Sequence, residues 1–85
     1  MSDVGVTVKF FASLREVVGV PEMQISASSL CQLKTHLKTQ LPAPVLSELL
    51  APNVRVAVNQ ALIEDDDLVL ADGDEVAFLP PVTGG

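Results

Sequence analysis

The length, composition and charge of the chain exclude several classes of protein. It has 85 residues, of which 48% are hydrophobic, and a formal net charge of −6 at pH 7. That hydrophobic content is too high for a disordered chain, and the length fits one small domain. No apolar run in the sequence approaches the roughly 18 residues of a membrane-spanning helix, so we expect no membrane segment.

The N-terminus and the cysteine content bear on location. Met1-Ser2-Asp3 carries an acid and no basic stretch, which argues against a signal peptide. The single cysteine, Cys31, cannot form an internal disulfide, as is usual for proteins of a reducing compartment. We therefore expect a cytoplasmic protein.

The charges are distributed unevenly. Seven of the eleven acidic residues fall between Glu64 and Glu75, and no Lys or Arg follows Arg55. Nucleic-acid binding needs clustered cations, so a nucleic-acid partner is not expected. The distribution favours a basic protein partner, but an acidic surface that only keeps the domain soluble explains it equally well.

The N-terminal third predicts two strands joined by a short helix. Residues 4–11 alternate with period two, which predicts a half-buried strand with Val4, Val6, Val8 and Phe10 facing the core. Phe11 then falls on the outer face. A short helix is predicted over 12–18 and a second strand over 22–26, which we expect to form a hairpin with the first.

The middle of the chain predicts one main helix. Ser29-Leu30-Cys31-Gln32 fits a capping box, with the serine accepting a hydrogen bond from the helix and Gln32 reaching back. An apolar stripe at helical spacing then continues to about residue 40 and consists of Leu30, Leu33, Leu37 and Leu41. Pro42 and Pro44 are expected to break this helix, and a further short helix is predicted over 45–51.

The last third predicts strands. Alternation over 54–58 places its valines on the core side, a turn and a short strand at 61–63 follow, and 75–79 closes the sheet with Leu79 outside. Strands followed by one main helix and more strands indicate an α+β fold with one sheet over that helix, the ubiquitin-like β-grasp. We expect residues 1–79 to form this domain, with its first and last strands adjacent in the centre of the sheet.

Residues 80–85 form an extended tail in this interpretation. Pro80 and Pro81 stiffen the exit from the last strand, because proline fixes φ and favours an extended residue before it. Six residues can reach roughly 20 Å. Gly84 and Gly85 lack a Cβ and can enter a narrow channel.

Three apolar side chains predict a docking patch at the root of this tail. Phe11 and Leu79 would lie close together on the outer face if their strands are neighbours, and Leu62 could join them. A single exposed apolar residue needs no explanation, but three together are typical of an interaction site.

Groups that could support catalysis within the chain are few. Cys31 lies near Lys34 and Lys38 but is better explained as a small packing residue, and His36 has no second histidine for a metal site. We therefore expect no bound metal or cofactor and no independent catalysis. The remaining reactive group is the carboxylate of Gly85, which becomes an electrophile once ATP adenylates it.

Three segments of the sequence resemble the small subunit of molybdopterin synthase. They are Val8-Lys9-Phe10-Phe11-Ala12 with Arg15-Glu16, Ala57-Val58-Asn59-Gln60, and Asp72-Gly73-Asp74-Glu75-Val76-Ala77-Phe78 continuing to Pro80-Pro81-Val82-Thr83-Gly84-Gly85. Residues 20–52 match only in pattern, and Leu79 stands where some relatives have Phe.

The resemblance implies a sulfur carrier in molybdenum cofactor biosynthesis. An adenylating, ubiquitin-activating-like enzyme would use ATP on Gly85, and a sulfurtransferase system would supply sulfur for a thiocarboxylate. The large subunit would receive the tail, in a heterotetramer, and convert cyclic pyranopterin monophosphate to the dithiolene of molybdopterin. By position, Gly85 bears the sulfur and Gly84 gives access, while the partner contacts come from Phe11, Leu62, Phe78, Leu79, Pro80, Pro81, Val82 and Thr83.

Three alternatives remain at this point. The chain could be a ubiquitin-like sulfur carrier for thiamine, cysteine or tRNA thiolation, although those carriers do not usually have the Pro-Pro-Val-Thr context. It could be a protein modifier joined to lysines, or a plain interaction domain.

Overall fold

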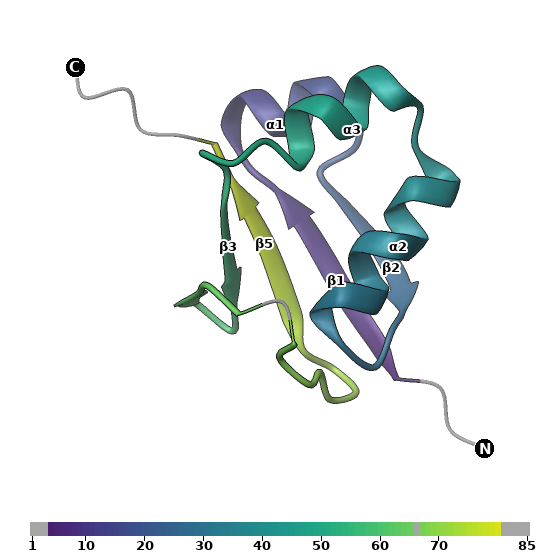
Figure 1. Cartoon of the computed structure of the whole chain (residues 1–85), viewed down its shortest axis with the longest axis vertical. Helices are drawn as coiled ribbons and strands as arrows, with labels where there is room; N and C mark the ends of the chain where they lie inside the picture. The colour runs from purple at the N-terminus through teal and green to yellow at the C-terminus, as the bar shows by residue number, and fades with distance from the viewer. Residues whose placement is uncertain (1–3, 66, 81–85) are drawn as a thin grey trace.

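The structure is a computed structural model that describes residues 4–65 and 67–80, in which five strands and three helices form two layers (Figure 1). In chain order the elements are β1 (Gly5–Phe10), α1 (Ala12–Val18), β2 (Glu22–Ser26), α2 (Leu30–Gln40), α3 (Ala43–Leu49), β3 (Arg55–Val58), β4 (Ala61–Ile63) and β5 (Glu75–Leu79). The three helices lie on one side of the sheet. The predicted α+β fold is confirmed.

The sheet has the order β2-β1-β5-β3-β4. β5 pairs with β1 in parallel, with Phe10 opposite Phe78, and with β3 antiparallel, with Leu79 opposite Arg55. The first and last strands are therefore adjacent at the centre, as predicted. β1 and β2 pair antiparallel, which confirms the predicted hairpin.

The core lies between the inner face of the sheet and the helices. Val6, Val8 and Phe10 of β1 are buried, as the alternation predicted, and the Phe10 and Phe78 rings stack with centroids 6.0 Å apart. The leucine stripe covers them from the helix layer, with Leu30, Leu33 and Leu37 buried. Burial of each such side chain contributes about 1.5–3 kcal/mol, so this contact between sheet and helix dominates the stability.

The N-terminus of α2 is capped by Ser29. Ser29 Oγ accepts a hydrogen bond from the Gln32 amide at 3.1 Å, which confirms half of the predicted capping box. The Gln32 side chain reaches back one residue further than a capping box requires, because its Oε1 accepts from the Ser28 amide at 2.6 Å. The two bonds hold the chain that enters α2 in an extended form.

The predicted bounds of α3 are wrong. α3 begins at Ala43 and ends at Leu49, whereas a helix over 45–51 was predicted. The prediction treated Pro44 as a breaker, but Pro44 lies in the first turn of α3, where a missing amide hydrogen leaves no bond unmade. The apolar run 68–70 contributes only an isolated bridge between Val69 and Ser29.

Candidate functional site

The end of β5 is the point at which the fold presents the C-terminal tail. β5 lies between β1 and β3. Its last paired residue is Leu79, which is opposite Arg55 of β3. Pro80 follows and has no amide hydrogen, so it cannot extend the ladder. The predicted site residues Pro81, Val82, Thr83, Gly84 and Gly85 lie outside the described residues.

Phe11 and Leu79 meet at this end of the sheet. The Phe11 amide donates to the Phe78 carbonyl at 3.3 Å, which continues the parallel pairing one residue beyond β1. Phe11 is 40% exposed, and Leu79 is half-buried. The strand register thus places Phe11 and Leu79 next to each other at the end of the sheet.

Leu62 lies on the same face but two strands away from β5. It is 61% exposed and pairs with Ala57 of β3, which in turn pairs with Ala77 of β5. Residues paired across antiparallel strands project from the same side of a sheet, so Leu62 shares the outer face with Leu79. We call Phe11, Leu62 and Leu79, with Arg55 between them, the outer patch.

Arg55 is the member of the outer patch that the sequence analysis missed. It is exposed, stands directly opposite Leu79, and alternates with the buried Val56. A signal was present, because the alternation over 54–58 that turned the valines inward also turned Arg55 outward. The sequence pattern does not reveal that β3 is the neighbour of β5 in the sheet, and this strand order is what places Arg55 beside Leu79.

The prediction that Phe78 contacts a partner is wrong. Its side chain is 0% exposed and packs against Phe10 on the inner face of the sheet. Phe78 therefore supports the outer patch only through the backbone that it shares with Leu79. Pro80 lies at the root of the tail and is half-buried, so part of its side chain is accessible to a partner.

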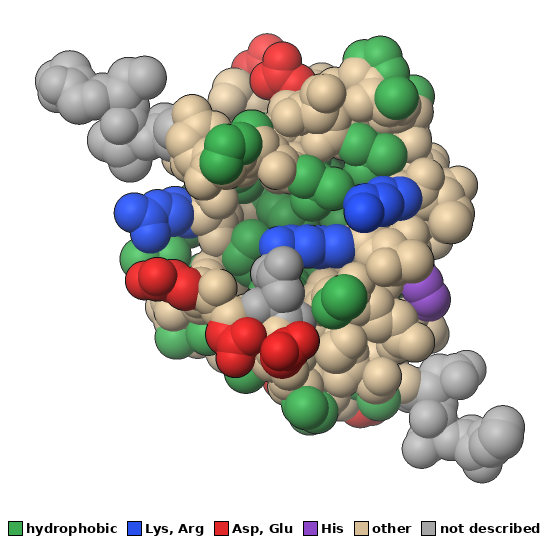
Figure 2. Space-filling model, in the orientation of Figure 1, with side chains coloured by type: hydrophobic (Ala, Val, Ile, Leu, Met, Phe, Trp, Pro, Cys, Tyr) green, Lys and Arg blue, Asp and Glu red, His purple; other side chains and the backbone are tan. Residues whose placement is uncertain are grey.

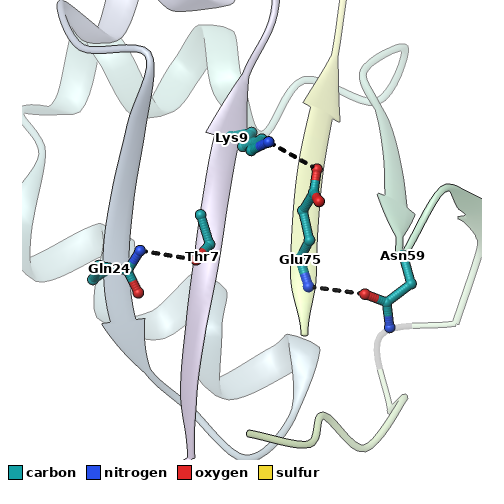
Figure 3. A network of polar contacts seen from close by, with 5 residues as sticks. All are labelled: Thr7, Lys9, Gln24, Asn59 and Glu75. Atoms are coloured by element: carbon teal, nitrogen blue, oxygen red, sulfur yellow. Dashed lines mark hydrogen bonds and ion pairs between the residues drawn. The ribbon is translucent and has the colours of Figure 1, made fainter. Parts of the chain in front are cut away.

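The other end of the outer face is polar (Figure 3). Lys9 Nζ lies 3.3 Å from Glu75 Oε2, and Gln24 Nε2 donates to Thr7 Oγ1 at 2.8 Å. Asn59 Oδ1 accepts from the Glu75 amide at 3.0 Å. These contacts tie the strands β2, β1 and β5 and the end of β3 together near the start of β5, so the face is polar at the end opposite to the one where the tail leaves.

Asp74 organises the turn that leads into β5. Its carboxylate accepts hydrogen bonds from the Ala71 amide at 2.8 Å and from Asn59 Nδ2 at 3.0 Å. The bond from Ala71, followed by that from Asn59, holds the pKa of Asp74 below its ordinary value of 3.8. The ionised carboxylate thus fixes the start of the strand whose other end carries the tail.

An open hollow of about 760 Å³ lies beside the root of the tail. Its walls come from α2, the segment 52–54, β3, β4 and the end of β5, and include Leu30, Lys34, Arg55, Glu64 and Pro80. Figure 2 shows the helix-covered side hollowed between the helices and β3, with apolar side chains inside and basic side chains at the rim. The hollow arises because α2 lies over β1 and β2 and leaves β3 less covered (Figure 1).

Sequence comparison decides the family of this chain. The profile of the ThiS family matches residues 8–85, and a "Molybdopterin synthase sulfur carrier subunit" of Escherichia coli is 42% identical over 82 residues, which cover 94% of this chain and 99% of the relative. The chain belongs to the ThiS family. Within that family it groups with the molybdopterin synthase sulfur carrier subunits, which confirms the resemblance seen in the sequence.

Solved structures share the fold over nearly the whole chain. One protein, in a complex titled as subunits 1 and 2 of the molybdopterin-converting factor from Helicobacter pylori, is 32% identical with a TM-score of 0.76, covering 96% of this chain and 100% of its own. Small archaeal modifier protein 1 from Methanosarcina acetivorans is 27% identical with a TM-score of 0.81, and both chains are covered completely. The β-grasp assignment is therefore confirmed.

The remaining candidate groups lie away from the end of β5. Cys31 is exposed on α2, and His36 is half-buried on the same helix. Within residues 4–65 and 67–80, no three His, Cys, Asp or Glu side chains are grouped so that they could hold a metal ion. None of the helices in this part of the chain is long and apolar enough to cross a bilayer.

Proposed function

We propose that this chain is the sulfur carrier subunit of a molybdopterin synthase and that it carries sulfur as a thiocarboxylate on Gly85. The chain matches its curated relatives over nearly their full length, at up to 42% identity. The tail Pro80-Pro81-Val82-Thr83-Gly84-Gly85 falls within the matched residues of the family. The cytoplasmic location expected from the sequence remains a prediction.

The observation that carries this proposal is the position of β5. A strand hydrogen-bonded on both sides is held rigidly, so its last residue is a fixed point from which a tail can project. That point adjoins the exposed Phe11 and the half-buried Leu79. A body that docks through these side chains would direct the tail the same way each time.

The chemistry proposed for Gly85 proceeds in three steps. Its carboxylate attacks the α-phosphorus of ATP in a separate adenylating enzyme, which forms an acyl adenylate and releases pyrophosphate. The terminal sulfur of a persulfide on the sulfurtransferase then attacks the acyl carbon and AMP leaves, which gives an acyl disulfide between the two proteins. Two electrons from a thiol reductant cleave its S–S bond, so that a terminal thiocarboxylate stays on Gly85 and the thiol of the donor is released. The sulfur is anionic at neutral pH and is a better nucleophile than the carboxylate oxygen.

The residue roles follow from this chemistry. Gly84 and Gly85, without side chains, allow the terminus to enter an enclosed active site, and Pro81, Val82 and Thr83 would contact the walls of the channel. Phe11, Leu62, Leu79 and Pro80 would dock on the large subunit. Groups that bind the pterin would belong to that subunit, as would the site where sulfur is transferred to cyclic pyranopterin monophosphate.

Intact-mass spectrometry after incubation with ATP, the adenylating enzyme and a sulfurtransferase with its sulfur source tests the proposal. We expect the mass to rise by the difference between one sulfur and one oxygen atom, with the change located in the C-terminal peptide. The loaded chain, mixed with the large subunit and its pterin substrate, should then return to its original mass as molybdopterin forms. An unchanged mass in the first step would refute the proposal.

A protein modifier is the second candidate, because small archaeal modifier protein 1 shares the fold over the whole length. The same experiment separates the two functions. A modifier would appear as a branched adduct on lysines of other proteins when the adenylating enzyme is present in a cell extract.

A further inference from the structure

Arg55, the last cation in the sequence, lies at the end of the sheet from which the tail leaves. It lies on the outer face, directly opposite Leu79, and β3 places it between Leu79 and the strand that carries Leu62. Its side chain is exposed and makes no ion pair with any residue in the described ranges. Glu64 lines the same hollow without bonding to it, whereas Lys9, further along the same face, is paired with Glu75.

The charges that follow Arg55 in the sequence are all of the opposite sign. It is the only Lys or Arg from residue 39 to residue 85, and seven acids lie between Glu64 and Glu75. A partner surface complementary to this half of the chain is mainly basic. Such a surface would repel Arg55 unless it placed a carboxylate opposite this one position.

Burial of Arg55 beneath a partner would strengthen the need for a carboxylate opposite it. A partner that covers Phe11, Leu62 and Leu79 also removes water from the guanidinium between them. A desolvated charge is costly unless it is paired and hydrogen-bonded, and a guanidinium matches a carboxylate with two parallel bonds. The apolar contacts provide the area of the interface, and the Arg55 pair would fix its register.

The tail is long enough to keep its reacting end away from Arg55. Six extended residues can carry Gly85 up to roughly 20 Å from the end of β5. The acyl phosphate or pterin phosphate in an enclosed site can therefore lie well beyond Arg55. The group opposite Arg55 belongs to the partner surface around the entrance of its channel.

We propose that Arg55 determines partner specificity by pairing with a carboxylate on the large subunit that receives the tail. This inference rests on the proposed function, because it assumes that the outer patch is covered by that subunit. Arg55 does not touch the reacting atoms, so its effect is on binding and on the choice of partner.

Binding of the full-length chain to the large subunit, measured by titration calorimetry, tests this role. Arg55→Leu is the decisive variant, since it enlarges the apolar patch while removing the charge. We expect Arg55→Leu to weaken binding by about tenfold or more, and Arg55→Glu to weaken it further. Lys38→Glu is the matched control for Arg55→Glu. It makes the same change in net charge, but at an exposed position of α2 in the helix layer. It should change the dissociation constant by less than about threefold.

The outcomes separate this inference from the proposed function. If the wild-type chain binds but Arg55→Leu binds equally well or more tightly, the patch is purely apolar and the role of Arg55 is refuted. Equal losses for Arg55→Glu and Lys38→Glu would also refute it, since they indicate only long-range repulsion. If the wild-type chain itself does not bind the large subunit, the proposed function fails and the role of Arg55 falls with it. Thermal melting of each variant confirms that it is folded.

Discussion

At the scale of single residues, a core residue and a residue of the outer patch are direct neighbours in the sequence, both at the end of β1 and at the end of β5. Phe10 is buried and Phe11 is exposed, and Phe78 is buried while Leu79 is half-buried at the surface. Substitution of an outward residue therefore removes little internal packing. Substitution of its inward neighbour would open a cavity and reduce the stability of the whole domain.

Phe11→Ala and Leu79→Ala should each weaken binding to the large subunit by about tenfold or more, as expected of anchors in a docking patch. Each should lower the free energy of unfolding by less than about 1.5 kcal/mol, because neither side chain is fully buried. Calorimetric binding and denaturant unfolding measure the two effects. Val69→Ala is the control, since Val69 is 77% exposed in the loop that precedes β5, at the opposite end of the strand from Leu79. A large loss of stability with unchanged affinity would contradict the assignment.

Asp74→Asn should destabilise the fold by about 1 kcal/mol, because an amide oxygen cannot replace both carboxylate bonds. The folded pKa of Asp74 lies below its ordinary value of 3.8, so ionised Asp74 stabilises the fold at higher pH. This contribution is lost as the pH falls below 3.8 and through the lowered folded value. Denaturant unfolding from pH 7 to pH 2 should thus show a smaller loss of stability in Asp74→Asn than in the wild type.

Asp67→Asn is the matched control for that experiment. Asp67 is exposed, and no hydrogen bond to its carboxylate is seen among the described residues. Its acid-induced loss of stability should match that of the wild type. Identical pH profiles for Asp74→Asn and Asp67→Asn would show that the turn does not depend on the charge of Asp74.

At the scale of elements, strand faces and the main helix could be predicted, because each depends on a local pattern. The alternation in β1 and β5 and the stripe on α2 report directly which side chains avoid water. The start of α3 could not be predicted in this way, since proline both ends helices and begins them. The role of Arg55 in the outer patch depends on the order of strands, and no local pattern encodes that order.

The cap of α2 gives the prediction for this scale. Ser29→Ala removes the oxygen that accepts from the Gln32 amide and should lower the free energy of unfolding by about 1 kcal/mol. Ser29→Asp supplies a new acceptor and should restore most of this loss. Because Ser29 belongs neither to the outer patch nor to the lining of the hollow, denaturant unfolding should register both changes while affinity for the large subunit stays constant. An equal loss for the two variants would mean that packing, not the cap, fixes this end of the helix.

At the scale of the whole molecule, the body and the tail should be separable. Among residues 4–65 and 67–80, the buried core extends from Val6 to Phe78. Removal of residues 81–85 should therefore change the free energy of unfolding by less than about 0.5 kcal/mol.

Removal of Gly85 alone should abolish thiocarboxylate formation in the intact-mass experiment. If the chain that lacks only Gly85 still supports dithiolene synthesis, the proposed role of this terminal glycine is contradicted.

The net charge of −6 gives a final prediction, which concerns the rate of association. If the acids between Glu64 and Glu75 steer the chain towards a basic partner, the association rate with the large subunit should fall severalfold as ionic strength rises from about 0.01 M to 0.15 M. Over that range the Debye length shrinks from about 30 Å to about 8 Å, and long-range attraction is screened before contact. The dissociation rate should change less, because it depends on the packed outer patch. Stopped-flow binding separates the two rates, and replacing Asp65 and Asp67 with Asn should reduce the salt dependence. An association rate that is independent of salt would mean that the acidic surface serves solubility and does not guide the encounter.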